Sequence, residues 1–227
     1  MRLAAFGDPQ YPSVSPDNAD RVSDPAVRSV VRGGATLQPL PFARTEVEGI
    51  ARLYRGSSQT FLGSEATEGR AKSIGRDVRV IHFATHGLVD ERFPLESALA
   101  LTIRESPKEG EDNGLLQAWE IFESVRLDAD LVTLSACETG LGKEMGGEGL
   151  VGLTRAFQYA GARTVVPSLW SVGDESTAQL MKTFYERLRA GVSKDEALRE
   201  AQLTLLGDPR TANPFHWAAF EVIGDWK

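Results

Sequence analysis

Three apolar runs rich in β-branched residues constrain the fold more than any other feature of this 227-residue chain. They are Val78–Thr85, Leu131–Ser135 and Thr164–Trp170. Their hydrophobicity is nearly continuous, which is typical of parallel strands that helices cover on both faces. Between the last two runs, residues Glu148 to Ala160 carry apolar side chains at helical spacing. This order of strand, helix and strand predicts a parallel crossover unit.

Other segments extend this alternation of helices and strands. Helices are predicted from Phe42 to Tyr54, from about Ser64 to Ile74, from Asp174 onward, and from a Ser193–Glu196 capping box to Gly207. Strands are predicted at Leu3–Phe6 and Phe220–Ile223, and a hairpin at Leu99–Ile103 and Gly114–Leu116, around a polar loop. The sequence therefore predicts an α/β sandwich with a mainly parallel central sheet.

The chain is expected to form one domain over residues 1–227. Residues 7 to about 41 are rich in proline, Asp, Ser and Gly, which predicts a surface loop with at most a turn of helix near Pro25–Val31.

Composition limits the classes of function. Lys and Arg number 25 against 32 Asp and Glu, a formal charge of -7, which argues against direct binding to nucleic acid. One cysteine cannot form an internal disulfide or a zinc cluster of cysteines. No apolar run approaches the ~20 residues that span a bilayer, and the first residues lack a signal-peptide profile. We expect a cytoplasmic protein without a membrane partner.

Reactive side chains follow several of the predicted strands. The only cysteine, Cys137, ends an apolar run and precedes a glycine-rich segment, and His86 ends another such run. Asp8 and Asp174 follow two more strands. Because parallel strands end at one edge of a sheet, these groups are expected to gather there.

A thiol and an imidazole from neighbouring strands suit covalent acyl transfer. His86 would act as the base that activates Cys137, since a free thiol is mostly protonated at neutral pH. The backbone N–H groups of Gly87 and Cys137 would form the oxyanion hole. The alternative is that Cys137 is a buried apolar group, as lone cysteines often are.

Other catalytic chemistries fit the sequence less well. His82 and His86 lie four residues apart, but on a strand they would be about 13 Å apart, too far to share a metal ion. His82 is interpreted as a core histidine, and His216, among aromatic residues, as a packing or hydrogen-bonding residue. There is no Gly-x-Ser-x-Gly elbow and no phosphate-binding glycine loop. No metal and no cofactor are expected.

Several stretches together resemble the CHAT domain family. They are Val80–Gly87, Leu134–Gly142, Gly149–Phe157, Ala160–Ala162, Ser168–Asp174, Gly7–Pro12 and Trp217–Phe220, and they span nearly the whole chain. CHAT domains are caspase-like cysteine peptidases related to separase and are often joined to tetratricopeptide repeats. The resemblance implies a three-layer caspase-like fold, with His86 as general base and Cys137, 51 positions later, as nucleophile. The stretch Ser135–Thr139 departs from the caspase signature Gln-Ala-Cys-x-Gly, so cleavage after aspartate is not implied.

The resemblance also indicates where substrate would bind. In caspase-like folds the pocket before the scissile bond lies at strand ends, which here carry Asp8, Ser135 and the segment ending at Asp174. Either carboxylate would pair with Lys or Arg of a substrate, as in separase. The alternatives are that Asp174 only caps a helix and that Asp8 only shapes a turn.

The resemblance implies a thiol protease of bacterial regulation, defence or programmed cell death, which cleaves specific protein partners. An attached tetratricopeptide-repeat or other sensor region is an expected partner. The alternative function is a catalytically silent interaction module with the same fold.

Overall fold

The structure is a computed structural model of the whole chain. It describes residues 1–12, 24–32, 37–104, 112–135, 137–138 and 148–227. The polar loop predicted at 105–113 and the glycine-rich segment after Cys137 lie largely outside these residues.

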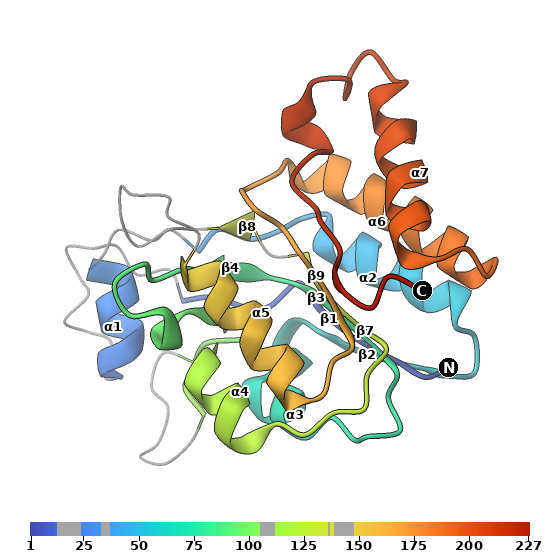
Figure 1. The fold of residues 1–227 in the computed structure, drawn as a ribbon. Helices are drawn as coiled ribbons and strands as arrows, with labels where there is room; N and C mark the ends of the chain where they lie inside the picture. The colour runs from blue at the N-terminus through green and yellow to red at the C-terminus, as the bar shows by residue number, and fades with distance from the viewer. Residues whose placement is uncertain (13–23, 33–36, 105–111, 136, 139–147) are drawn as a thin grey trace.

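A six-stranded sheet forms the centre of the molecule (Figure 1). Its strands, in spatial order, are β10 (Ile223–Gly224), β9 (Thr164–Pro167), β7 (Leu131–Leu134), β3 (Val80–Ala84), β1 (Leu3–Gly7) and β2 (Ser58–Leu62). Every pair is parallel except that of β10 with β9. The predicted mainly parallel sheet is confirmed, and the three apolar runs supply three adjacent strands, β3, β7 and β9.

Helices cover both faces of this sheet, which gives three layers (Figure 1). On one face lie α3 (Glu68–Lys72), α4 (Ala118–Ser124) and α5 (Glu148–Ala160); on the other lie α2 (Ala43–Leu53), α6 (Asp174–Arg189) and α7 (Lys194–Leu206). The side chains of β1 alternate between two cores. Phe6 packs in the core that contains Phe157 of α5, whereas Ala5 packs in the core that contains Phe184 of α6. Such two-sided burial explains the continuous apolar runs.

A second, smaller sheet continues from the carboxyl edge of the first. Its order is β6 (Leu115–Gln117), β5 (Ala98–Ala100), β4 (His86–Leu88) and β8 (Cys137–Glu138). β5 and β6 form the predicted antiparallel hairpin. The helix α1 (Pro25–Arg32) packs against this sheet through Val27 and Val30. Asp24 accepts a hydrogen bond from the Val27 N–H, so Asp24 and Pro25 begin the helix as cap and first helical residue.

Some predicted elements differ in detail from the observed ones. The helix predicted from Ser64 to Ile74 is a 3-10 turn, η2 (Gly63–Glu65), followed by the short α3. Ser193 is the N-cap residue of α7, but its hydroxyl donates to Asp195 instead of capping the backbone, so the predicted capping box is wrong. The predicted final strand is shorter, since β10 contains only Ile223 and Gly224, although Phe220 bridges to Ser168. The remaining 3-10 turns are η3 (Pro94–Glu96) and η4 (Pro214–His216).

Two glycines let α5 approach a neighbouring loop closely. A Cβ atom on Gly149 would lie 2.4 Å from Val89 Cγ1, and one on Gly152 would lie 2.7 Å from the Pro94 carbonyl oxygen. Real Cβ atoms do not tolerate such distances, so only glycine fits at either position. This contact fixes the start of α5 beside the segment that follows β4.

Candidate active site

His86 and Cys137 are register partners on adjacent parallel strands. In the small sheet, β4 pairs with β8 so that His86 lies opposite Cys137 and Gly87 opposite Glu138. In the large sheet, the first four residues of β3 likewise pair with the residues 51 positions later in β7, as Val80 pairs with Leu131. The register therefore continues unchanged from the first sheet into the second. Neighbouring strands lie about 4.8 Å apart, so the chain brings these two backbone positions together across 51 residues.

The imidazole of His86 is buried and has a defined tautomer. Its Nε2 atom lies 2.7 Å from the carbonyl oxygen of Gln38. Because a carbonyl only accepts, Nε2 must carry the proton. Nδ1 is then the atom with a free lone pair in the neutral ring, and it has no hydrogen-bond partner within the described residues.

Burial keeps this imidazole uncharged. The ring is 5% exposed, and desolvation lowers the pKa of His86 below its ordinary value. The hydrogen bond to the Gln38 carbonyl acts in the opposite direction but is the smaller effect. A neutral imidazole with its unprotonated nitrogen unpartnered is the form that a general base requires.

Tyr11 also contacts His86. The Tyr11 hydroxyl donates to the carbonyl of Ala100 at 2.8 Å and lies 3.5 Å from the backbone nitrogen of His86. The two rings are 5.3 Å apart between centroids and inclined by 49°. Neither Tyr11 nor Gln38 was among the predicted site residues. Gln38 contacts His86 through its backbone carbonyl, so its residue type gives no signal. Tyr11 lies in Gly7–Pro12, one of the stretches that resemble the CHAT domain family, which is the signal that could have found it.

Ser135 directly follows β7 and lies two residues before Cys137. Its side chain is 6% exposed, and its hydroxyl has no hydrogen-bond partner in the described part of the chain. Gly87, predicted for the oxyanion hole, lies between Leu99 of β5 and Glu138 of β8 in the small sheet.

Asp8 lies at the expected edge but its carboxylate is already paired. It follows β1 and accepts from Arg44 of α2, with Oδ2 at 2.9 Å from Nε and 2.7 Å from the terminal nitrogen. Among the described residues other than glycine, it alone has a positive φ, of 52°. Asp8 therefore has a left-handed backbone conformation and forms an ion pair within the chain.

Asp174 is the first residue of α6. The N-cap position belongs to Gly173, one residue earlier, so the alternative that Asp174 caps this helix is wrong. The hydroxyl of Ser176, in the first turn, donates to the Gly173 carbonyl at 2.8 Å.

The other two histidines have structural partners. His82 is fully buried, and its ring nitrogens bond to Glu46 of α2 at 2.8 Å and to the Tyr185 hydroxyl of α6 at 3.2 Å. His216 lies 3.3 Å from the Ser176 hydroxyl and packs edge-on against Phe215. Both predictions, of a core histidine and of a packing or hydrogen-bonding one, are confirmed.

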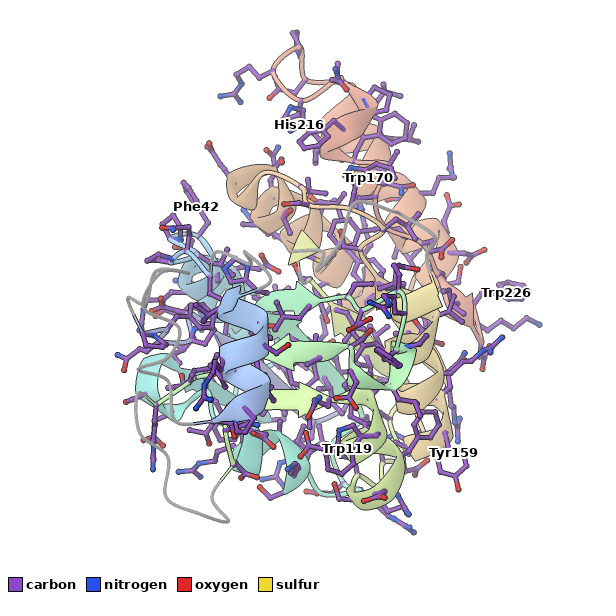
Figure 2. The ribbon with its side chains drawn as sticks, turned by 90° about the vertical axis from the view of Figure 1, so that its left-hand side faces the viewer. Phe42, Trp119, Tyr159, Trp170, His216 and Trp226 are labelled. Carbon is purple, nitrogen blue, oxygen red and sulfur yellow. The ribbon has the colours of Figure 1, made fainter. Side chains whose placement is uncertain are left out.

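Several surface pockets lie around these elements. One of about 420 Å³ lies between Pro41 and Phe42, which follow Gln38, and the first turn of α6, near His216 and Thr211. Figure 2 shows Phe42, Trp170 and His216 around this end of the molecule. Another pocket of about 600 Å³ lies between α1 and the β4–β6 strands and includes Leu88. The first pocket borders the segment that follows Gln38, and the second borders β4, the strand that carries His86.

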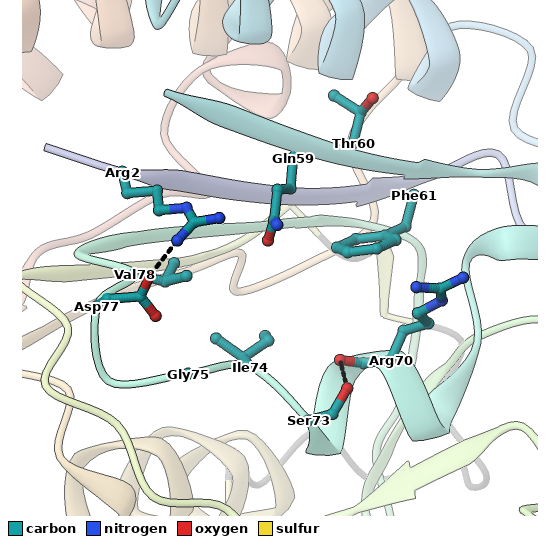
Figure 3. A pocket seen from close by; sticks show the side chains of 10 residues that line it. All are labelled: Arg2, Gln59, Thr60, Phe61, Arg70, Ser73, Ile74, Gly75, Asp77 and Val78. Atoms are coloured by element: carbon teal, nitrogen blue, oxygen red, sulfur yellow. Dashed lines mark hydrogen bonds and ion pairs between the residues drawn. The ribbon is translucent and has the colours of Figure 1, made fainter. Parts of the chain in front are cut away.

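A pocket of about 540 Å³ lies elsewhere, along the edge strand β2 (Figure 3). It reaches Arg2 and Asp77, which form an ion pair just before β1 and β3 begin. Phe61 and Arg70 form another part of its wall, with the guanidinium 5.4 Å from the ring centroid. Since His86 lies beyond the carboxyl end of β3, this pocket extends toward the opposite end of the strands.

The fold defines a caspase-like α/β protein. Among solved structures, the Arg-specific cysteine proteinase gingipain R matches 99% of this chain and 46% of its own, with a TM-score of 0.58 and 8% identity. The separase of Saccharomyces cerevisiae, in complex with securin, matches 98% of this chain and 12% of its own, with a TM-score of 0.53 and 13% identity. At these identities the likeness concerns the fold alone.

The sequence then identifies the family. The CHAT domain matches residues 2–225, and the chain belongs to this family. Mouse tetratricopeptide repeat protein 28 is 30% identical over 95% of the chain, and its human counterpart is 28% identical over the same share. The chain spans only 10% of the length of either relative. Within the described residues, no helix is both long and apolar enough to cross a membrane.

Proposed function

We propose that the chain is a cysteine peptidase in which His86 is the general base and Cys137 the nucleophile. The single observation that carries this proposal is the pairing of these residues in the β4–β8 register. The unpartnered Nδ1 of His86, held by the Gln38 contact on the opposite nitrogen, supports it.

The proposed reaction is a two-step acyl transfer. Nδ1 of His86 accepts the thiol proton, and the thiolate attacks the carbonyl carbon of the scissile peptide bond. The C–N bond breaks as the imidazolium returns its proton to the leaving amine. Water, activated by the same imidazole, then hydrolyses the thioester and restores the thiol. The oxyanion hole at Gly87 and Cys137 stays a prediction.

A basic-residue preference is a weaker part of the proposal. Asp8 would recognise Lys or Arg of a substrate only if it exchanged Arg44 for the substrate cation. Arg44→Ala would free this carboxylate, so labelling by an arginine-containing electrophile should accelerate if Asp8 binds substrate. Arg44→Ala combined with Asp8→Asn is the control. Equal labelling rates in wild type and both variants would rule Asp8 out as a substrate ligand.

The test of the main proposal is labelling with a peptidyl acyloxymethyl ketone that carries Arg or Lys beside the electrophile. One label per chain is expected in wild type and none in Cys137→Ala. His86→Ala should label at least about 100-fold more slowly, the usual contribution of a general base. His216→Ala is the matched control and should label like wild type. Labelling that persists in Cys137→Ala, or is unchanged in His86→Ala, would contradict the assigned roles.

A silent interaction module is the second candidate. The observation that favours it is that the mouse and human relatives are named for repeats, which form binding surfaces, and not for a reaction. Alkylation of Cys137 by iodoacetamide separates the two functions, because the chain has no other thiol. A thiol that reacts with iodoacetamide but with no peptide electrophile would favour the silent module. An adjoining repeat region, protein substrates and a bacterial, cytoplasmic setting remain predictions.

A further inference from the structure

Tyr11 contacts the proposed base in two ways, through its hydroxyl and through its ring, and the proposed reaction gives it no role. We propose that Tyr11 is a positioning residue, whose ring and hydroxyl hold the His86 imidazole with Nε2 toward Gln38 and Nδ1 unpartnered. This inference rests on the proposed function, in which His86 is the base. Its test includes a measurement that does not depend on catalysis.

The hydroxyl of Tyr11 links two paired strands. His86 of β4 and Ala100 of β5 are register partners in the antiparallel pairing of these two strands. The hydroxyl donates to the Ala100 carbonyl at 2.8 Å and can accept from the His86 N–H at 3.5 Å. One side chain thus fixes the backbone from which the imidazole extends, and does so from the segment that follows β1.

The ring of Tyr11 limits the orientations of the imidazole. The two ring centroids are 5.3 Å apart, and Tyr11 also packs against the core between α1 and the small sheet, which contains Val27 and Leu88. The imidazole is also held by the 2.7 Å contact between its Nε2 atom and the Gln38 carbonyl oxygen. Rotation of the ring would break that hydrogen bond and change its contact with the phenol. Tyr11 and Gln38 therefore both restrain one side chain.

Tyr11 also contributes to keeping His86 uncharged. Burial is the largest cause of the lowered pKa of His86, and the phenol is one of the groups that cover this ring. Neither the phenol nor the Gln38 carbonyl carries a charge at neutral pH, so both act through desolvation and hydrogen bonding. Loss of the phenol should admit water and raise the pKa of His86 toward about 6.5.

A purely structural role for Tyr11 makes a different prediction. The side chain would then stabilise the small sheet, and its loss would lower stability without changing the titration of a folded His86. Stability alone cannot separate the two roles, whereas the protonation and tautomer of His86 can.

The first measurement is the NMR titration of the histidine rings in wild type, Tyr11→Phe and Tyr11→Ala. The chain has only three histidines, so His86→Gln identifies the relevant signals. In Tyr11→Ala we expect a raised His86 pKa and nitrogen shifts that indicate mixed tautomers; Tyr11→Phe should show a smaller change in the same direction. Tyr159→Phe and Tyr159→Ala, at a tyrosine that is 68% exposed on α5, are the matched controls. If Tyr11→Ala does not fold, Tyr11→Leu replaces it.

The second measurement is the rate of Cys137 alkylation by iodoacetamide between pH 5 and 8. If His86 activates the thiol, Tyr11→Ala should lower the rate at neutral pH by up to about 100-fold, the cost that a misplacement of about 1 Å can have. An unchanged His86 titration in both Tyr11 variants would overturn the positioning role and leave the peptidase proposal intact. A changed titration, with alkylation equal in wild type, the Tyr11 variants and His86→Gln, would support positioning and count against the peptidase.

Discussion

Loss of the Tyr185 hydroxyl should lower the stability of the chain, because this atom joins a buried hydrogen-bond network. Tyr185 is fully buried in α6, and its hydroxyl lies 2.8 Å from Thr133 Oγ1 and 3.2 Å from His82 Nδ1. The other ring nitrogen of His82 bonds to the Glu46 carboxylate, so it carries a proton. In a neutral ring, Nδ1 then accepts from Tyr185, and Tyr185 accepts from Thr133. Every member of this network has a partner, and the network joins α2, β3, β7 and α6.

The change Tyr185→Phe would leave two buried polar groups without partners. Each such group costs about 1–3 kcal/mol, and removal of the phenol hydroxyl relieves about 1–2 kcal/mol of its own desolvation. Taking the middle of each range, two orphaned groups at about 2 kcal/mol each, less about 1.5 kcal/mol of relieved desolvation, give an expected loss of about 2.5 kcal/mol in the free energy of unfolding. For a chain of this size that corresponds to a fall in Tm of about 5–10 °C.

Urea denaturation followed by circular dichroism would measure this loss. Tyr54→Phe is the matched control, since Tyr54 lies beside Tyr185 with ring centroids 6.3 Å apart and its hydroxyl has no hydrogen bond within the described residues. The double variant Tyr185→Phe with Thr133→Val should be more stable than the sum of the single losses predicts, because it removes one of the orphaned groups. A loss below about 0.5 kcal/mol, or strictly additive losses, would refute the reasoning.

Two further predictions concern α5 and His86. Gly149→Ala should lower the free energy of unfolding by about 1–3 kcal/mol, because its Cβ would lie 2.4 Å from Val89 Cγ1. Gly49→Ala in α2 should raise the free energy of unfolding by about 0.5–1 kcal/mol, because a Cβ atom there would have no other atom within 4 Å and alanine favours the helix. Thermal unfolding of the two variants measures both changes. The lowered pKa of His86 means that the folded chain binds fewer protons than the unfolded chain, in which the residue titrates near 6.5. The free energy of unfolding should therefore fall as pH drops below about 6.5, by at most about 1.4 kcal/mol per unit from this residue. His86→Gln should remove that part of the slope between pH 7.5 and 5.5 in urea titrations, and an identical slope would contradict it.

The central sheet could be predicted because its strands are buried on both faces. That burial demands the continuous apolar runs from which β3, β7 and β9 were expected, and α5 has the predicted bounds Glu148–Ala160. β2 was missed because it is an edge strand whose sequence, Ser58 to Leu62, is half polar and only partly buried. The small sheet was only half predicted, since β4 and β8 have three and two residues and are defined by their pairing.

In the candidate site, too, some residues could be predicted from the sequence and some contacts could not. His86 and Cys137 were expected because strand ends and the CHAT resemblance both point to them, and Ser135 was expected from the resemblance. The contact of Gln38 with His86 depends on a backbone carbonyl, which any residue supplies, so no sequence pattern indicates it. The pairing of Asp8 with Arg44 joins residues from two elements and could not be read from either. What the sequence left open was therefore which of the predicted polar groups are already satisfied within the chain.

The separation of His86 and Cys137 follows from the register of the central sheet. The same offset of 51 residues pairs His82 with Thr133 in β3 and β7 and pairs His86 with Cys137 in β4 and β8. Because side chains alternate along a strand, a slip of one residue in the first pair would mismatch the second. His82 and Thr133 are also the two strand residues that Tyr185 joins. The buried hydrogen-bond network thus fixes, four residues upstream on each strand, the register on which the alignment of the proposed base and nucleophile depends.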